Sequence, residues 1–154
     1  MILGVHHPAL SVPDMDQALE FYCGVLGFET AMEAGWPSGV TPMDEAMALE
    51  DSACKVAMIK KGNSCIELFE FTAGSTQDAT PNRPVSRRGI THIALGVDDF
   101  ANEYERLKGA GMKFNTEPQG EGSGRWVYGR DPFGNVIELL EHDPESPTSL
   151  RWED

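Results

Sequence analysis

Two histidines and two glutamates stand at matching positions in the two halves of the sequence. His7 and His92 each begin the pattern His-x-Ala-Leu-x-Val-x-Asp, and Glu67 and Glu138 each follow an isoleucine and precede a leucine. Imidazole nitrogens and carboxylate oxygens form a borderline ligand set that suits Zn, Ni, Co, Mn or Fe. Two carboxylates beside polar imidazoles would be costly to bury without a cation. The four residues are therefore predicted to hold one divalent metal ion.

A simpler interpretation exists for each of these residues taken alone. A single histidine in a strand is usually structural or lies on the surface, and a single glutamate there is usually solvated. Chance does not place the same pair at matching positions in both halves, so the repetition favours metal ligation. His6 has Thr91 as its counterpart and is expected to face the helix, and His142 lies beyond the repeat and is expected on the surface.

The repetition extends past these four residues and predicts the order of elements. Each copy begins with an aliphatic, β-branched run, Val5–Val12 or Ile90–Val97, that is typical of a strand. A helix follows, with Asp14 or Asp99 as its N-cap. The interval from His to Glu is about 14 residues longer in the first copy, and we place this extra length in the Gly-, Pro- and Met-rich stretch 35–48.

Three further short strands in each copy complete a βαβββ unit, so the chain is predicted to be an α+β protein of two tandem βαβββ modules. The first module spans 1–72 with the insertion at about 35–48, a polar linker spans 73–88, the second module spans 89–142, and 143–154 form a tail. The three further strands are expected near Phe28–Glu33, Lys55–Lys60 and Ser64–Phe71, and near Lys113–Thr116, Arg125–Arg130 and Val136–Glu141.

Alternation along these strands places the four candidate ligands away from the helices. His7 shares a face with Ala9, whereas the aliphatic residues between and beyond them point to the other face and pack under the helix. His92, Glu67 and Glu138 occupy equivalent positions. If the two modules pair about a pseudo-twofold axis, all four side chains converge.

Composition excludes several classes of partner. The chain has 154 residues, with 12 Lys and Arg against 25 Asp and Glu, and a formal net charge of −13. Such a surface repels phosphate backbones and anionic headgroups, so no nucleic-acid and no membrane partner is expected. No apolar run approaches the length of a membrane span, and the N-terminus lacks the features of a secretory signal. The three cysteines form no paired motif, which favours reduced thiols and a cytoplasmic location.

The sequence resembles the vicinal oxygen chelate superfamily, also called glyoxalase/bleomycin-resistance/extradiol-dioxygenase proteins. The resemblance covers about residues 4–141. It is carried by His7-Pro8-Ala9-Leu10-Ser11-Val12-Pro13-Asp14, Phe21-Tyr22, Leu26-Gly27-Phe28, Ile66-Glu67-Leu68, His92-Ile93-Ala94-Leu95 and Asp131-Pro132-Phe133-Gly134-Asn135-Val136-Ile137-Glu138-Leu139. It implies a cup-shaped mixed sheet around one divalent metal ion with open positions for two adjacent oxygens of a small-molecule substrate. It also implies a homodimer, in which the metal ligands come from one chain or from two.

By analogy with the family, Glu67 and Glu138 are candidate catalytic bases on opposite sides of a substrate. That arrangement suits a metal-dependent isomerase or epimerase, which removes a proton next to a carbonyl to give an enediolate-type intermediate and returns it from the other side. Methylmalonyl-CoA epimerase is similar in length and module order but often has Gln where this chain has Glu67. The longer first module with Trp36 is closer to cyclitol- or sugar-ketone epimerase-like members.

Three alternatives remain open at this point. A glyoxalase I-type lyase uses the same four ligand types, but it usually carries Arg where this chain has Ser11. A metal-free small-molecule-binding module would lack the quartet. An extradiol dioxygenase has no carboxylate at the position of Glu67, which makes that chemistry the least favoured.

Two segments near the quartet have no settled role in the sequence. The run 125–130 contains two arginines beside a tryptophan and a tyrosine, which either face the substrate or form a surface strand edge. The glycine-rich run 120–124 lacks the helix of a dinucleotide-binding loop, so it is interpreted as a flexible rim or a lid.

Overall fold

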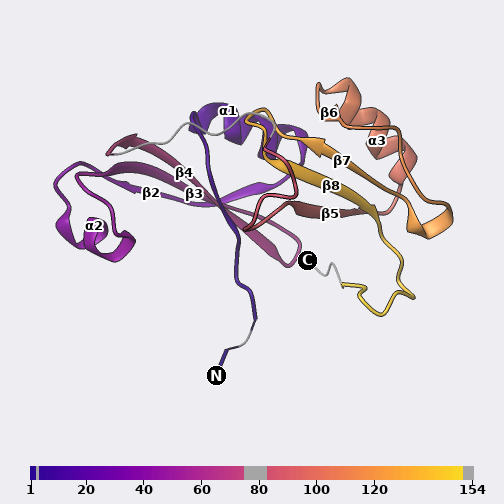
Figure 1. Cartoon of the computed structure of the whole chain (residues 1–154), viewed down its shortest axis with the longest axis horizontal. Helices are drawn as coiled ribbons and strands as arrows, with labels where there is room; N and C mark the ends of the chain where they lie inside the picture. The colour runs from indigo at the N-terminus through magenta and orange to yellow at the C-terminus, as the bar shows by residue number, and fades with distance from the viewer. Residues whose placement is uncertain (3, 75–82, 151–154) are drawn as a thin grey trace. The chain divides into compact units, whose positions relative to one another are not determined.

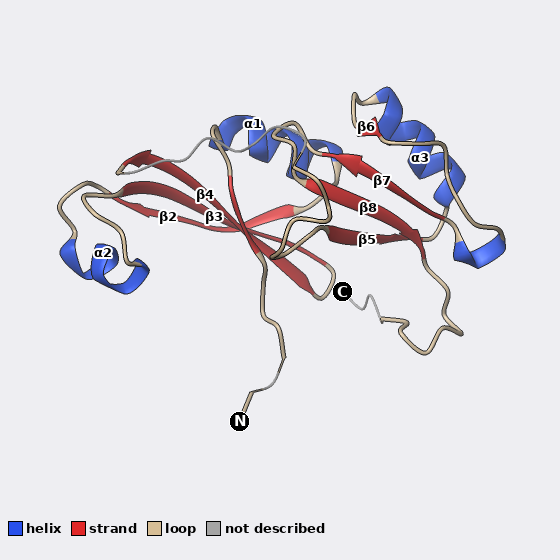
Figure 2. Ribbon diagram, in the orientation of Figure 1, coloured by secondary structure: helices blue, strands red, loops and turns tan. Residues whose placement is uncertain are grey.

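The computed structural model describes residues 1–2, 4–74 and 83–150 (Figure 1). The chain divides between residues 78 and 79 into two compact units. Both are built from a four-stranded mixed sheet and helices, as the ribbon colouring of Figure 2 shows, so the predicted α+β class with tandem βαβββ modules is confirmed. Within the described ranges, no helix has the length and apolar character needed to cross a membrane.

The first unit contains β1 (Ala9–Ser11), α1 (Met15–Leu19), β2 (Glu29–Trp36), α2 (Thr41–Met47), β3 (Ala53–Lys61) and β4 (Ser64–Ala73). A π-helical segment, Glu20–Val25, continues α1. The strand order in the sheet is β1-β4-β3-β2, with β1 parallel to β4 and the other pairs antiparallel. The first strand of the module therefore lies beside its last strand.

The second unit repeats this plan. It contains β5 (Ile93–Val97), α3 (Phe100–Gly109), β6 (Lys113–Phe114), a short 3₁₀ turn (Gly122–Gly124), β7 (Trp126–Arg130) and β8 (Val136–Glu141). The strand order is β5-β8-β7-β6, again with the first strand parallel to the last. The two modules thus share one topology, and where the first has α2 the described part of the second has only the short 3₁₀ turn.

Both first helices begin where the sequence predicts. The Asp14 carboxylate accepts a hydrogen bond from the Gln17 N–H at 2.9 Å, and the Asp99 carboxylate accepts one from the Asn102 N–H at 3.4 Å. The helices bury one face against their sheets through Met15, Ala18, Phe21 and Tyr22 in the first unit and Phe100, Tyr104 and Leu107 in the second. The facing strand residues Ile59, Ile66 and Leu68, and Val127, Ile137 and Leu139, are almost fully buried. The opposite face of each sheet is the face that carries Glu67 or Glu138.

The first strand of each module is shorter than predicted. β1 begins at Ala9 and β5 at Ile93, so His7 and His92 lie in extended chain just before the strands. The Pro8 carbonyl still accepts a hydrogen bond from the Glu67 N–H at 3.0 Å, but proline has no N–H with which to continue the ladder. The other predicted strands agree with β2–β4 and β6–β8 to within a few residues.

The inserted segment and the glycine-rich run both adopt defined structure. The insertion predicted at 35–48 holds the end of β2 and the helix α2, which Figure 1 shows at the connection between β2 and β3. In the glycine-rich run 120–124, the Gly124 N–H donates to the Glu121 carbonyl at 3.1 Å, and Ser123 Oγ donates to the Asp143 carboxylate at 3.1 Å. Part of the predicted linker (75–82) and of the predicted tail (151–154) lies outside the described residues.

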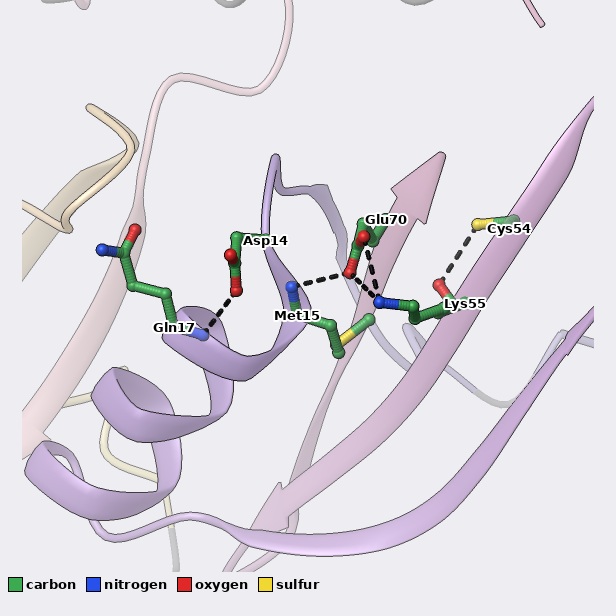
Figure 3. A network of polar contacts seen from close by, with 6 residues as sticks. All are labelled: Asp14, Met15, Gln17, Cys54, Lys55 and Glu70. Atoms are coloured by element: carbon green, nitrogen blue, oxygen red, sulfur yellow. Dashed lines mark hydrogen bonds and ion pairs between the residues drawn. The ribbon is translucent and has the colours of Figure 1, made fainter. Parts of the chain in front are cut away.

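A charged pair ties the last two strands of each module together. In the first unit, Lys55 Nζ contacts both Glu70 carboxylate oxygens at 3.1 and 3.0 Å, and Glu70 also accepts the Met15 N–H at the start of α1 (Figure 3). In the second unit, Arg125 makes a two-pronged contact with the Glu141 carboxylate, with both distances 2.6 Å. Each pair holds the helix-facing side of the strand that carries the candidate glutamate.

Burial also affects the neighbouring thiol of the first unit. Cys54 donates through Sγ to the Lys55 carbonyl at 3.2 Å (Figure 3), and burial raises the pKa of this thiol to about 11. All three cysteines are free, and Cys54 stays protonated at neutral pH.

We expect Glu141→Gln to lower the free energy of unfolding by about 1 kcal/mol at pH 7, since the variant loses the charge-assisted pair with Arg125. The Arg125 hydrogen bonds lower the pKa of Glu141 from its ordinary value. A carboxyl group with a lowered pKa in the folded state stabilises the protein above the ordinary glutamate pKa of about 4.3, and this contribution is lost as the pH falls through the lowered value. Urea unfolding of both proteins between pH 7 and pH 3 measures the difference, with the exposed Glu145→Gln as control. A gap that persists unchanged at pH 3 would contradict the assignment.

Candidate metal centre

The first unit brings His7 and Glu67 into contact. His7 Nε2 lies 3.2 Å from a Glu67 carboxylate oxygen, and the side chains are 30% and 20% exposed. Glu67 sits in the middle of β4, opposite Ala9 in the parallel pairing with β1. The backbone bond from Glu67 to Pro8 fixes the segment that carries His7 beside it. The two side chains form the first half-site.

The second unit repeats the same pair. His92 Nε2 lies 3.1 Å from a Glu138 carboxylate oxygen, and the side chains are 29% and 15% exposed. Glu138 pairs with Ala94 in the parallel ladder between β5 and β8, just as Glu67 pairs with Ala9. The sequence repeat therefore corresponds to a repeat of side-chain geometry, and the second pair forms the equivalent half-site.

Each histidine is held through its other ring nitrogen. His7 Nδ1 lies 2.7 Å from His6 Nδ1, and His92 Nδ1 lies 2.7 Å from Thr91 Oγ1. Metal-binding histidines commonly bond through the second nitrogen to a neighbouring polar group, which orients the ring. His6 was expected to face the helix, but it is exposed and contacts the His7 ring because the chain is not yet a strand at this point. The sequence offered a signal for this contact, because a polar residue, His6 or Thr91, directly precedes each candidate histidine.

The donor set of each half-site fits a divalent metal. Ligand atoms about 2.1 Å from a metal ion lie roughly 3.0 Å apart at a right angle and about 3.4 Å apart in a tetrahedron. The Nε2-to-oxygen distances of 3.2 and 3.1 Å lie in this range. Among the described residues, no group of three or more His, Cys, Asp or Glu side chains gathers at one point, and each half-site is one His–Glu pair.

Tyr128 completes the second half-site and has no counterpart in the first. It lies opposite Glu138 in the β7–β8 ladder, and its ring meets the His92 ring edge-on with centroids 5.2 Å apart. Partial burial, followed by the Glu138 charge and a hydrogen bond to that carboxylate, raises the pKa of Tyr128, so the hydroxyl is protonated at neutral pH and donates to Glu138. The equivalent position opposite Glu67 is Met58. Tyr128 was not among the predicted site residues, and the signal that could have identified it is the strand register of the β7–β8 hairpin, which pairs it with Glu138.

The arginines of the same segment do not provide the substrate cations considered from the sequence. Arg125 is paired with Glu141. Arg130 donates to the Gly134 carbonyl at 2.7 Å and to the Arg83 carbonyl at 3.0 Å. Both guanidinium groups therefore make contacts within the module. Tyr128 is the residue of this segment that contacts the half-site.

The turn before Glu138 is held by a buried carboxylate. Asp131 is 5% exposed and accepts hydrogen bonds from the backbone N–H groups of Phe133 and Asn135 at 3.0 and 2.7 Å. The Asn135 side chain donates to the other carboxylate oxygen at 2.8 Å. Such a turn sets the register at which β8 begins and hence the position of Glu138.

Comparison with known proteins places this architecture among established relatives. The chain is 32% identical over 98% of its length to a 2-epi-5-epi-valiolone epimerase of Actinomyces sp, of which 86% is covered. It is 30% identical over 88% of its length to a probable lactoylglutathione lyase of Synechocystis sp., of which 92% is covered. The crystal structure of a glyoxalase family protein from Bacillus cereus is similar with a TM-score of 0.80 and 26% identity, covering 92% of this chain and 95% of that one.

The family model described as Glyoxalase/Bleomycin resistance protein/Dioxygenase superfamily matches residues 4–139, which include both half-sites. The sequence repeat, the paired βαβββ topology and this match agree, and relatives in this family are epimerases and lyases. The chain belongs to the Glyoxalase/Bleomycin resistance protein/Dioxygenase superfamily.

Proposed function

We propose that this protein is a divalent-metal-dependent epimerase that acts on the carbon next to a carbonyl group. The observation that carries the proposal is the pair of equivalent half-sites, each with one histidine and one glutamate in contact. Two carboxylates at equivalent positions in the two modules suit a reaction in which a proton leaves one side of a carbon and returns to the other. The similarity to 2-epi-5-epi-valiolone epimerase supports this choice of reaction.

His7, Glu67, His92 and Glu138 would hold the metal ion, which is Zn, Ni, Co, Mn or Fe by the chemistry of the donors. When bound, the metal supplies Lewis acidity, which stabilises negative charge on the substrate carbonyl oxygen. The two histidines would bind it through Nε2, because Nδ1 of each ring lies beside a polar atom of the preceding residue.

Glu67 and Glu138 also move the proton. Each carboxylate has a second oxygen beyond the one that faces its histidine, and this oxygen can accept a proton. One glutamate removes the proton from the carbon, the C–H electron pair moves toward the carbonyl oxygen to give an enediolate, and the other glutamate donates a proton to the opposite face. Tyr128 donates a hydrogen bond to Glu138 alone, so we expect the two bases to differ in strength.

A glyoxalase I-type lyase is the second candidate, since a relative of the chain is a probable lactoylglutathione lyase. That reaction uses the same proton chemistry on the adduct of glutathione and methylglyoxal. Ser11 occupies the place where an arginine is usual in such enzymes, and it lies in β1 opposite Phe69, a position without charge. This observation favours the epimerase.

The test is deuterium exchange in D2O. We expect the metal-loaded protein to exchange one carbon-bound hydrogen of 2-epi-5-epi-valiolone, measured by proton NMR, and to lose this activity after EDTA treatment. Addition of a divalent metal should restore it. Parallel incubations use methylmalonyl-CoA and the glutathione–methylglyoxal adduct. Turnover of the adduct alone would select the lyase, and ligand binding that survives EDTA without any exchange would select a metal-free binding module.

A further inference from the structure

The sheet face that carries Glu67 also carries a cluster of three aromatic side chains. Side chains alternate along β4, so Glu67, Phe69 and Phe71 share one face. Register across the sheet adds Trp36, because Phe71 pairs with Cys54 and Cys54 pairs with Trp36. We call Trp36, Phe69 and Phe71 the aromatic wall.

The three rings of the aromatic wall are in mutual contact. Phe69 and Phe71 are stacked with centroids 5.7 Å apart and an interplanar angle of 10°. Trp36 meets them edge-on, with centroid distances of 6.4 and 6.3 Å. All three side chains are half-buried, so the rings still offer surface to a ligand. The helix-facing residues of the same strand, Ile66 and Leu68, are 3% and 0% exposed.

Trp36 is held in place by the inserted segment. Its indole N–H donates to Ser52 Oγ at 3.0 Å, and Ser52 Oγ donates in turn to the Asp44 carboxylate of α2 at 2.5 Å. The Ser52 N–H donates to the same carboxylate at 3.0 Å, and these bonds lower the pKa of Asp44, which therefore stays ionised. In the described residues of the second module a 3₁₀ turn stands in place of α2, so this support belongs to the first half-site.

The chemistry of the wall defines what it can bind. Among the described residues, strand register places Cys54, Val56 and Met58 of β3 and Ser11 of β1 on the same face, none of them a cation. The nearby cation Lys55 lies on the other face with Glu70. A phosphate or carboxylate would lose its hydration there without gaining a partner. Residues two apart in a strand are about 6.8 Å apart, so the wall begins about one six-membered ring away from Glu67.

We infer that the aromatic wall binds the C–H face of an uncharged cyclic ketone whose carbonyl end lies at Glu67. Dispersion contacts between ring C–H groups and aromatic faces supply the affinity, and the half-site at the end of the wall supplies the reacting groups. The position of the reacting carbon rests on the proposed function, whereas the binding of the ring does not. The wall thus selects compact uncharged rings over CoA thioesters and glutathione adducts.

The test compares a ring with an acyclic probe. Calorimetry measures the dissociation constants of 2-epi-5-epi-valiolone and of hydroxyacetone, which also has adjacent oxygens but no ring, for the full-length metal-loaded protein. We expect Trp36→Leu to raise the dissociation constant of the cyclic ketone about tenfold and Trp36→Phe to raise it less. The dissociation constant of hydroxyacetone should not change. Ser52→Ala removes the acceptor of the indole N–H and keeps the ring. Its dissociation constant for the cyclic ketone should lie between those of the wild type and Trp36→Leu.

Thermal unfolding of each variant checks that the fold is retained, and Trp36→Phe preserves the test if Trp36→Leu does not fold. The proposal would be overturned if both probes bound more weakly by the same factor, or if the cyclic ketone bound with unchanged affinity in both Trp36 variants. Its failure is distinct from that of the proposed function. If the epimerase is wrong, exchange is absent in all proteins while the Trp36-dependent affinity persists; if the wall is wrong, exchange survives and the affinity does not depend on Trp36.

Discussion

Replacing Glu67 or Glu138 by glutamine will lower the rate of deuterium exchange into the cyclic ketone by about 10²- to 10⁴-fold, the range that a positioned general base contributes. Glutamine keeps the size of the side chain and an amide oxygen that can face its histidine, but it does not take up a proton at neutral pH. The exchange rate at saturating substrate, followed by NMR in D2O, is the measurement. The loss should appear mainly in kcat, because binding of the ring is assigned to other side chains.

The matched control for this prediction is Glu141→Gln. Glu141 lies three residues after Glu138 in β8, carries the same chemical group and is paired with Arg125, on the side of the strand that does not face the half-site. Its replacement should leave the exchange rate within about threefold of the wild type while lowering stability. Unchanged exchange in both the Glu67 and the Glu138 variants would refute the proposed two-base reaction.

We expect His92→Ala to abolish metal binding. The wild type is expected to hold about one divalent ion per chain, and loss of one of the four proposed ligands, together with its orienting contact to Thr91, should weaken binding by at least about 100-fold. Elemental analysis after dialysis, on protein purified without a metal-binding tag, gives the stoichiometry. His142→Ala is the control, because His142 lies after the end of β8 and outside both half-sites. A metal content that is normal in His92→Ala would exclude His92 as a ligand.

Mixing two variants decides whether one chain or two supply the quartet. His7→Ala damages the first half-site and His92→Ala damages the second. If a dimer joins the half-sites of different chains, a refolded mixture regains about a quarter of the metal sites, because one site in each mixed dimer is intact. If each chain holds its own metal, the mixture regains none.

The repeat made most of the fold predictable. His-x-Ala-Leu-x-Val-x-Asp contains the start of a strand and the N-cap of the next helix, so the sequence alone predicts Asp14 and Asp99 as N-caps. Alternation in the run around Glu67 separated a buried face from a face with polar groups, and burial of Ile66 and Leu68 confirms that separation. These inferences succeeded because they depend only on local periodicity and capping.

The parts that were missed depend on register between strands. Tyr128 is ten positions before Glu138, and only the hairpin pairing places them side by side. The pairing of Arg125 with Glu141 has the same cause. The insertion was recognised by its length, but its helix was not, because Gly- and Pro-rich composition favours loops; Pro42 lies in the first turn of α2, where a missing N–H costs nothing.

The parallel pairing of β1 with β4 affects the order in which parts of the protein fold. The residue that supplies the imidazole of a half-site is among the first of its module to be synthesised, and the carboxylate that meets it lies 60 residues later in the first module. The hairpin of β3 and β4 can form early from local contacts, whereas docking of the histidine segment must close a long loop. Each half-site is therefore among the last features of its module to assemble, and a nascent chain can bring a histidine and glutamate together only once a whole module has emerged.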